Sequence, residues 1–198
     1  MANEIGKTFV FFGIAGAGKG TQIKLLTDLL KGKDGKEMVY ISPGNEYRKI
    51  IQSGTQTASL VKTILDRGGL LPNFLTGSVV ASVLVNGISP DKNLILDGYP
   101  RTIPQAEFLE QAMGFYEREN IKVIYIELSK EEASKRLKLR ARHDDTDEGI
   151  ATRFDDYVKN VIPSMNYFKD KSGYTIYTIN GEQTVENVHK DIIKALGY

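Results

Sequence analysis

The sequence predicts an α/β fold in which helices cover both faces of a five-stranded parallel sheet. Two observations support this prediction. Five short apolar segments rich in β-branched or aromatic residues have the character of buried strands, and a helical segment follows each of them. Parallel neighbours in a sheet need a long crossover connection, which a helix usually supplies, so this alternation is typical of a parallel sheet.

The composition is that of an ordinary globular domain. The chain has 198 residues, of which 41% are hydrophobic and 26% are charged, and its formal net charge is +1. Such a balance argues against a general nucleic-acid or membrane-surface binder, which would present a field of one sign. No apolar run approaches the roughly 18 residues of a membrane helix, and the N-terminal MANEIGK is too polar for a signal peptide. We therefore expect a cytoplasmic protein without nucleic-acid or membrane partners.

Cysteine and histidine content limits the metal chemistry. The chain has no cysteine, which excludes disulfides and any cysteine-based structural zinc site. Its two histidines, His143 and His189, are far apart in the sequence, so no histidine metal cage is expected.

In the N-terminal half, each expected element follows from a local pattern. KTFVFFG combines aromatic and β-branched residues and ends in glycine, which is typical of a buried strand that leads into a loop. After the loop, Ile23, Leu26, Leu29 and Leu30 share one helical face. The expected elements are, in order, a strand at 7–13, a helix from about 20–21, a strand at 38–41, a helical segment at 46–67 with a break near 53–54, and a helix at 74–87.

The C-terminal half continues the alternation. Ser129 and Glu132 have the spacing of a capping box, which predicts a helix start directly after the longest apolar strand. Pro163 predicts a kink in a later helix. The expected elements are, in order, a strand at 93–97, a helix at 103–117, a strand at 121–128, a helix from 129, a helix from about 148 to 168, a strand at 174–180, and a closing helix at 185–196.

In open parallel sheets, ligands bind beyond the carboxyl ends of the strands. The sequence therefore predicts that the chemistry lies at four loops that follow strands, at 13–21, 42–48, 97–101 and just after Leu128.

The first of these loops has the pattern of a phosphate-binding P-loop. Gly13–Thr21, GIAGAGKGT, matches Gly-x-x-x-x-Gly-Lys but has Gly20 where a metal-binding hydroxyl is usual, with the hydroxyl one residue later at Thr21. Glycines let the backbone turn its N–H groups towards phosphate oxygens, and the positive end of the next helix faces the same anion. Lys19 adds a point charge for the β- and γ-phosphates. The alternative is a flexible glycine turn that binds no phosphate, with Lys19 exposed to solvent.

The third strand delivers Asp97 at its carboxyl end. In a P-loop protein such an aspartate holds Mg²⁺, directly or through its water shell, because Mg²⁺ keeps several waters and takes few protein ligands. The alternative is that Asp97 merely caps the turn in DGYPR.

Two motifs together resemble the adenylate kinase family of nucleoside monophosphate kinases. Gly13–Gln22 matches its Gly-x-x-Gly-x-Gly-Lys-Gly-Thr-Gln loop, and Asp97–Arg101 matches its Asp-Gly-[Phe/Tyr]-Pro-Arg segment. The resemblance implies one domain over 1–198 with a P-loop three-layer fold, an inserted helical lobe for the monophosphate and a short lid. The implied parts are a core at 1–41, 78–139 and 153–198, the lobe at about 42–77 and the lid at about 140–152.

The resemblance also implies an acceptor site for AMP. Arg101 and Arg48 would bind the acceptor phosphate, and the Gln105 amide would recognise adenine, since it can both donate and accept. Pro43 and Asn45 depart from the family's Ser-Thr-Gly-Asp-x-x-Arg segment, and Asn73 replaces a frequent aspartate. The implied AMP-binding residues are Ser42, Pro43, Arg48, Gly69, Leu71, Gly98, Arg101 and Gln105.

On the donor side, the resemblance implies an ATP site and a lid with converging arginines. The implied ATP-binding residues are Gly16, Ala17, Gly18, Lys19, Gly20, Thr21, Arg136 and Gln183. The implied catalytic residues are Lys19, Arg101, Arg140, Arg142 and Arg153, with Mg²⁺ held by Asp97 through water. Asp144 and Asp145 would hold the arginines, although Asp145 could instead cap the next helix. We expect His143 to be a surface residue.

The activity implied is reversible transfer of the γ-phosphoryl group of Mg·ATP to AMP, giving two ADP, by a monomeric enzyme. Three alternatives remain open. One is a related kinase that prefers UMP, CMP or another monophosphate; the second is a small-metabolite P-loop kinase; the third is a nucleotide-binding homologue that has lost catalysis. Gln105 favours adenine, whereas Pro43 leaves the acceptor open.

Overall fold

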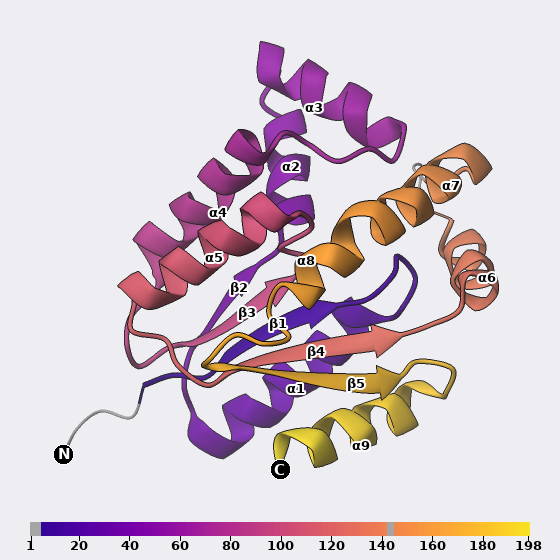
Figure 1. Cartoon of the computed structure of the whole chain (residues 1–198). Coiled ribbons are helices and arrows are strands. Elements are labelled where there is room, and N and C mark those ends of the chain that lie inside the picture. The colour runs from indigo at the N-terminus through magenta and orange to yellow at the C-terminus, as the bar shows by residue number, and fades with distance from the viewer. Residues whose placement is uncertain (1–4, 142–144) are drawn as a thin grey trace.

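The computed structural model describes residues 5–141 and 145–198, and it confirms the predicted fold class. Five strands form one sheet in the order β2-β3-β1-β4-β5, and all four strand pairs are parallel. Figure 1 shows the strands fanned side by side. Their arrowheads, which mark the carboxyl ends, lie on the side of the sheet where α6 and α7 are found. The strands are β1 (Thr8–Phe12), β2 (Met38–Ile41), β3 (Asn93–Asp97), β4 (Ile121–Glu127) and β5 (Tyr174–Asn180).

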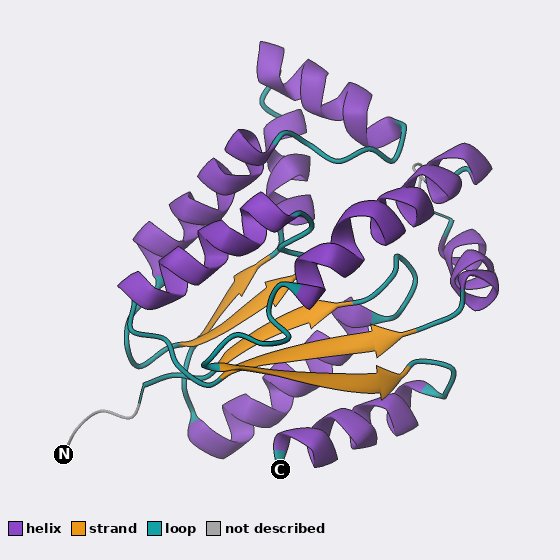
Figure 2. Ribbon diagram, viewed as in Figure 1, coloured by secondary structure: helices purple, strands orange, loops and turns teal. Residues whose placement is uncertain are grey.

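Helices cover both faces of the sheet. Figure 2 shows α4, α5 and α8 on one face and α1 and α9 on the other, with α2 and α3 extending beyond the sheet. The helices are α1 (Lys19–Asp34), α2 (Pro43–Ile51), α3 (Gln56–Asp66), α4 (Asn73–Gly87), α5 (Ile103–Phe115), α6 (Lys130–Arg140), α7 (Asp147–Asp156), the π-helical turn η1 (Tyr157–Val161), α8 (Ile162–Asn166) and α9 (Val185–Leu196).

The central strand β1 fixes the position of the site. Every residue of β1 is buried, because the strand has a neighbour on each side and helices above and below. Alternate side chains enter two different apolar clusters, with Phe9 and Phe11 in one and Val10 and Phe12 in the other. Burial on both faces explains why four of its five residues, Phe9–Phe12, are apolar, and it makes β1 a rigid base for the loop at its carboxyl end.

Helices α1 and α2, which flank the predicted site, begin earlier than the sequence patterns predicted. Helix α1 begins at Lys19, directly after Gly18, whose φ of 84° is a left-handed conformation that favours glycine. Helix α2 begins at Pro43 rather than near Glu46, with Ser42 as its N-cap. Proline suits the first turn of a helix because its missing N–H would have no intrahelical partner there. Pro43, which departs from the family pattern, is therefore compatible with the first turn of α2.

Only half of the predicted capping box is present. The Ser129 hydroxyl accepts a hydrogen bond from the Glu132 N–H at 3.2 Å, as predicted. The reciprocal bond was predicted wrongly: Glu132 pairs with Arg136 instead, and the Ser129 N–H donates to Glu182 at 2.9 Å. A carboxylate from the β5–α9 loop thus completes the cap.

The irregularity expected at Pro163 is a π-helical turn. It spans Tyr157–Val161 directly before the proline, and the Ile162 N–H donates to the carbonyl of Tyr157, five residues earlier. One extra residue in this turn changes the register between α7 and α8.

Arg118 joins the segments that lead into β1 and β3, at the end of the sheet opposite the predicted site. Its side chain is 5% exposed and donates to three backbone carbonyls, those of Gly6 at 2.7 Å, Lys92 at 2.9 Å and Ser89 at 2.6 Å. These carbonyls precede β1 and β3, so the guanidinium joins the two entering segments.

We expect Arg118→Ala to destabilise the fold without changing the site. Three carbonyls would lose a charged donor, which costs about 4 kcal/mol and lowers the Tm of a chain of this size by roughly 10 °C. Thermal unfolding, together with an assay of the activity proposed below on the same sample, would test this. Arg118→Lys should retain part of the stability, and an unchanged Tm in the alanine variant would contradict the prediction.

Within 5–141 and 145–198, no helix combines the length and apolar character needed to cross a membrane.

Candidate nucleotide site

The loop between β1 and α1 forms a tight turn around the Lys19 side chain. Gly16 has a φ of 91°, and a Cβ there would lie 2.8 Å from the Ala133 carbonyl oxygen, so both conformation and space require glycine. The Lys19 Nζ folds back onto the loop and donates to the carbonyls of Gly13 at 2.7 Å and Ile14 at 3.1 Å. A Cβ at Gly20 would meet nothing within 4 Å, so the described chain leaves open space at that position.

Charged groups from three other segments influence the Lys19 amine electrostatically. Burial lowers the pKa of Lys19 to about 8, while the charge of Asp97 opposes this shift and the charges of Arg101 and Arg140 add to it. Asp97 in β3, Arg101 in the β3–α5 loop and Arg140 in α6 were predicted to belong to one site. All three lie close enough to influence the pKa of the loop lysine.

Asp97 lies at the end of β3 with one oxygen engaged by a tyrosine. The Tyr40 hydroxyl donates to Asp97 Oδ2 at 2.7 Å. Burial is the main cause that raises the pKa of Tyr40 to about 12, and its bond to Asp97 adds to the shift, so the phenol stays a donor at neutral pH. No lysine or arginine among the described residues forms an ion pair with Asp97.

The donor set at Asp97 fits a magnesium ion that retains its waters. The described residues contain no cluster of three or more histidines, cysteines, aspartates or glutamates that could enclose a metal. A single half-buried carboxylate without a cationic partner is instead suited to Mg²⁺, which takes most of its ligands from water and phosphate.

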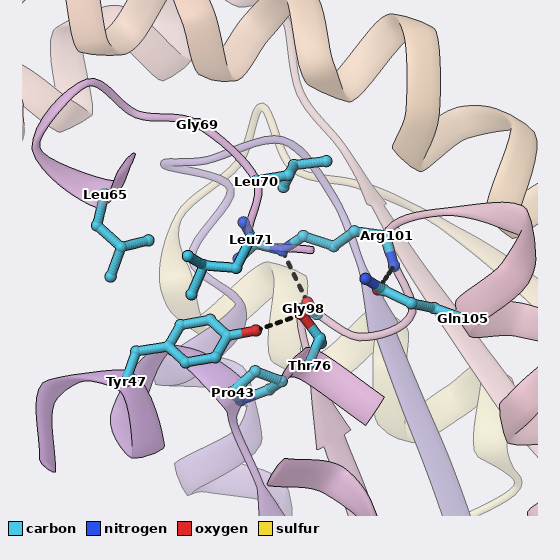
Figure 3. Close-up of a pocket in the computed structure, with 10 residues that line it drawn as sticks. All are labelled: Pro43, Tyr47, Leu65, Gly69, Leu70, Leu71, Thr76, Gly98, Arg101 and Gln105. Atoms are coloured by element: carbon cyan, nitrogen blue, oxygen red, sulfur yellow. Dashed lines mark hydrogen bonds between the residues drawn. The ribbon is translucent and has the colours of Figure 1, made fainter. Parts of the chain in front are cut away.

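A pocket lies between α2, the α3–α4 segment and the β3–α5 loop (Figure 3). It brings together five of the predicted acceptor residues: Pro43, Gly69, Leu71, Gly98 and Arg101. A sixth, Gln105, lines it with its amide directed towards the Arg101 backbone. The Arg101 guanidinium is exposed and held by a bond from its Nε to the Gly98 carbonyl at 2.8 Å. An apolar wall beside a guanidinium suits a ligand that has both a planar base and a phosphate.

The Gln105 amide is held in one orientation. Its Oε1 accepts from the Arg101 backbone N–H at 2.8 Å, and its Nε2 donates to Asn73 Oδ1 at 3.0 Å. A backbone N–H can only donate, so it fixes which end of the amide is oxygen. Each end keeps one further hydrogen-bonding position, which leaves Gln105 able to donate and accept at the same time.

Two predicted acceptor residues do not line this pocket. Arg48 is exposed and donates to Asn45 Oδ1, so the asparagine that departs from the family pattern is the partner of this arginine. Ser42 is the N-cap residue of α2 and interacts with the Tyr40 hydroxyl.

Arginines converge on Asp145 between α6 and α7. Asp145 has only 1% of its side chain exposed. Arg140 donates to it twice, at 3.0 and 2.7 Å, and Arg153 donates once, at 2.9 Å. The alternative that Asp145 caps α7 is wrong, because Thr146 accepts from the Gly149 N–H at 3.1 Å. Arg142, His143 and Asp144 lie outside the described residues.

Arg136 and Gln183 meet at a second, open depression. It is lined by Glu132, Arg136, Glu182, Gln183, Thr184 and Asn187. Arg136 donates to Glu132 at 2.8 Å and to the Gly181 carbonyl at 3.1 Å, which holds its guanidinium against the β5–α9 loop. The structure therefore joins two predicted residues that lie far apart in the sequence.

Several residues of the site were missed by sequence reasoning. Tyr47 and Thr76 line the acceptor pocket and share a hydrogen bond of 2.7 Å, and Leu65 and Leu70 add to its apolar wall. Tyr40 was missed as the partner of Asp97. The sequence predicted only that Tyr47 lies in a helical segment, which carries no information on what its side chain contacts.

Comparisons with known proteins identify relatives of this chain. The adenylate kinase family model matches residues 11–173. A Prochlorococcus marinus (strain MIT 9301) protein named adenylate kinase is 36% identical over 186 residues, covering 94% of this chain and 96% of the relative. Adenylate kinases from Petrotoga mobilis and Corynebacterium aurimucosum are each 33% identical, covering 94% and 96% of this chain and 96% and 98% of the relatives. The chain belongs to the adenylate kinase family.

Proposed function

We propose that this protein transfers the γ-phosphoryl group of ATP to AMP, reversibly, giving two ADP. The observation that carries the proposal is the cluster at the carboxyl ends of β1 and β3. There the loop lysine lies within electrostatic reach of Asp97, Arg101 and Arg140, and the pocket lined by Gln105 opens beside it. Family membership agrees, since the relatives named above are adenylate kinases.

On the acceptor side, the proposed roles follow from the pocket. Arg101 would bind the phosphate of AMP, and Gln105 would recognise adenine with its remaining donor and acceptor. Leu71 and Pro43 would contact the base, with the backbone of Gly69 and Gly98 close by. Arg48 and Ser42, which lie outside the pocket lining, would reach the phosphate when the segment around them moves inwards.

On the donor side, the loop residues 16–21 would enclose the phosphates of ATP, and Lys19 would exchange its two carbonyl partners for phosphate oxygens. Arg136 and Gln183 would flank the base at the open depression. Asp97 would hold Mg²⁺ through water, and the ion would neutralise charge on the phosphates.

The reaction needs positioning and charge neutralisation rather than a general base. The second pKa of a phosphate monoester is about 6, so AMP is already a nucleophilic dianion at neutral pH. The remaining obstacle is repulsion between two polyanions, which Lys19 and the arginines at 101, 140 and 153 would offset. We assign Arg142 to the same group from its motif.

We further propose that the segments at about 42–77 and 140–152 close over the nucleotides and exclude water. A backbone contact supports this: a Cβ at Gly68 would lie 2.5 Å from the Gly149 carbonyl oxygen, so the α3–α4 turn already touches α7. Two glycines at this contact allow the backbones to approach closely.

A panel of monophosphates tests the activity and its main alternative. We expect AMP to have the highest kcat/KM, by at least tenfold over UMP, CMP and GMP, in a coupled assay of ADP formation. A clear preference for a pyrimidine would reject the role of Gln105. Absence of transfer to every monophosphate would favour a nucleotide-binding protein without catalysis.

The low pKa of Lys19 predicts a pH dependence of ATP binding. Phosphates favour the charged amine, so the pKa of Lys19 is higher in the complex than its value of about 8 in the free protein. Below this value the amine is already charged and affinity is constant. Above it, binding must take up a proton, and the affinity falls by up to about tenfold per pH unit.

Titration calorimetry at about pH 7 and about pH 9 measures this effect. The wild type should lose affinity at the higher pH and take up protons, which makes the observed heat depend on the buffer. Lys19→Met should bind ATP weakly at both pH values and lack this part of the proton uptake. The same proton uptake in both proteins would show that another group titrates.

We also propose a monomer located in the cytoplasm, on the balanced charge of +1 and the family resemblance. Light scattering of the purified protein tests the first of these, and fractionation of cells that express it tests the second.

A further inference from the structure

We propose that Tyr40 is a positioning residue for the magnesium site: its hydroxyl holds one oxygen of Asp97 and leaves the other free for a metal-bound water. The proposal rests on the proposed function, and it concerns a residue of β2 that belongs to neither the phosphate loop nor the acceptor pocket.

Strand register places the two side chains together. In the parallel pairing of β2 with β3, Tyr40 lies opposite Ile95 and Ile41 lies opposite Leu96. Ile95 and Asp97 point to the same face of the sheet, since they are two residues apart. Tyr40 is therefore the diagonal neighbour of Asp97, and diagonal neighbours on one face are within reach of an aromatic side chain.

The hydrogen bond divides the two oxygens of the carboxylate. Asp97 Oδ2 accepts from the Tyr40 hydroxyl at 2.7 Å, and the described residues offer no other hydrogen-bond partner to this side chain. Without the phenol, the carboxylate could rotate towards the positive charge of Lys19, which already senses it. A fixed carboxylate has one oxygen directed outwards, as a water-mediated metal contact requires.

The phenol also lies near the acceptor side of the site. Ser42 and the charge of Arg48 both lower the pKa of Tyr40. Ser42 is the N-cap residue of α2, the helix that lines the acceptor pocket, so Tyr40 lies near the start of that helix as well as beside Asp97. With 41% of its surface exposed, Tyr40 adds little to the core, which separates a positioning role from a packing role.

Tyr40→Phe tests the proposal because it removes only the hydroxyl. Mn²⁺ binding to the protein–ATP complex, with protein in excess, can be measured by electron paramagnetic resonance. We expect the Mn²⁺ dissociation constant to rise by roughly tenfold, the lower range for loss of a hydrogen-bond partner of a metal-holding group. ATP affinity in EDTA should be unchanged.

Tyr167→Phe is the matched control. It also removes a phenol that donates to a carboxylate, that of Glu110, but on α5 and the segment after α8, outside the site. Its Mn²⁺ affinity should equal that of the wild type. Tyr40→Phe in an Asp97→Ala background should cause no further loss of Mn²⁺ affinity, because Tyr40 acts only through Asp97.

Equal Mn²⁺ affinity in wild type and Tyr40→Phe, or additive losses in the double variant, would overturn the proposal. These outcomes are separate from the proposed function, which fails only if the wild type does not phosphorylate AMP. A wild type inactive on AMP whose Mn²⁺ affinity still depends on Tyr40 would keep the positioning role and reject the activity.

Discussion

Arg101→Ala is expected to lower kcat/KM for AMP by roughly a thousandfold, because it removes a preorganised cationic donor from the point where the two polyanions meet. The guanidinium is exposed, and within the described residues its one hydrogen bond is from Nε to the Gly98 carbonyl, so little folding energy depends on it. The Tm should therefore stay close to that of the wild type.

The same substitution should leave base recognition intact. Gln105 is oriented by the backbone N–H of residue 101 and by Asn73, both of which alanine at 101 preserves. Steady-state kinetics with AMP, GMP and CMP should show all three falling by a similar factor. Arg101→Lys, which keeps the charge but not the planar fork, should recover only part of the activity. Wild-type kcat/KM in Arg101→Ala would refute the assignment of this residue.

Asp145→Asn is expected to cause the largest combined loss of stability and activity. The nearly inaccessible carboxylate of Asp145 accepts from Arg140 and Arg153, and asparagine removes the negative charge that pairs with both guanidinium groups. Breaking a buried ion pair from one side costs about 3 kcal/mol, which lowers the Tm by roughly 6–12 °C in a chain of this size. We expect kcat to fall by about tenfold or more, because both arginines lose their common anchor.

Asp147→Asn provides the control two residues away. Asp147 pairs with Lys138 at 2.8 Å, but its side chain is 85% exposed, and exposed ion pairs contribute little. The unfolding temperature and the kcat of Asp147→Asn should match those of the wild type. If both variants behaved alike, the arrangement around Asp145 would not be the cause of the effect.

The sequence allowed the strands and the phosphate loop to be predicted because their signals are local. The run at Phe9–Phe12 is apolar because β1 is buried on both faces, and the glycines at 13, 16 and 18 each have a positive φ angle. The predicted break near 53–54 also separates α2 from α3, although the predicted helix start near Glu46 is later than the observed start at Pro43.

Contacts between distant segments could not be predicted in this way. The Tyr40–Asp97 bond depends on the register of two strands that are 57 residues apart, and the Gln105–Asn73 bond joins residues 32 apart. The third partner in the cap of α6, Glu182, comes from a loop 53 residues further along the chain. Each of these contacts depends on how helices and strands pack, which no single segment of sequence encodes.

The π-helical turn at Tyr157–Val161 makes the length of this helix as important as its composition. Before the turn, Arg153 faces Asp145; after it, Ser164 and Met165 are buried against the core. Removing one residue from the turn would favour a regular α-helix. The helical face that carries Arg153 would then turn by about 100° relative to the face that carries Ser164 and Met165. Homologous sequences that vary freely here in residue type should therefore seldom vary in residue number, so alignment gaps should avoid this segment.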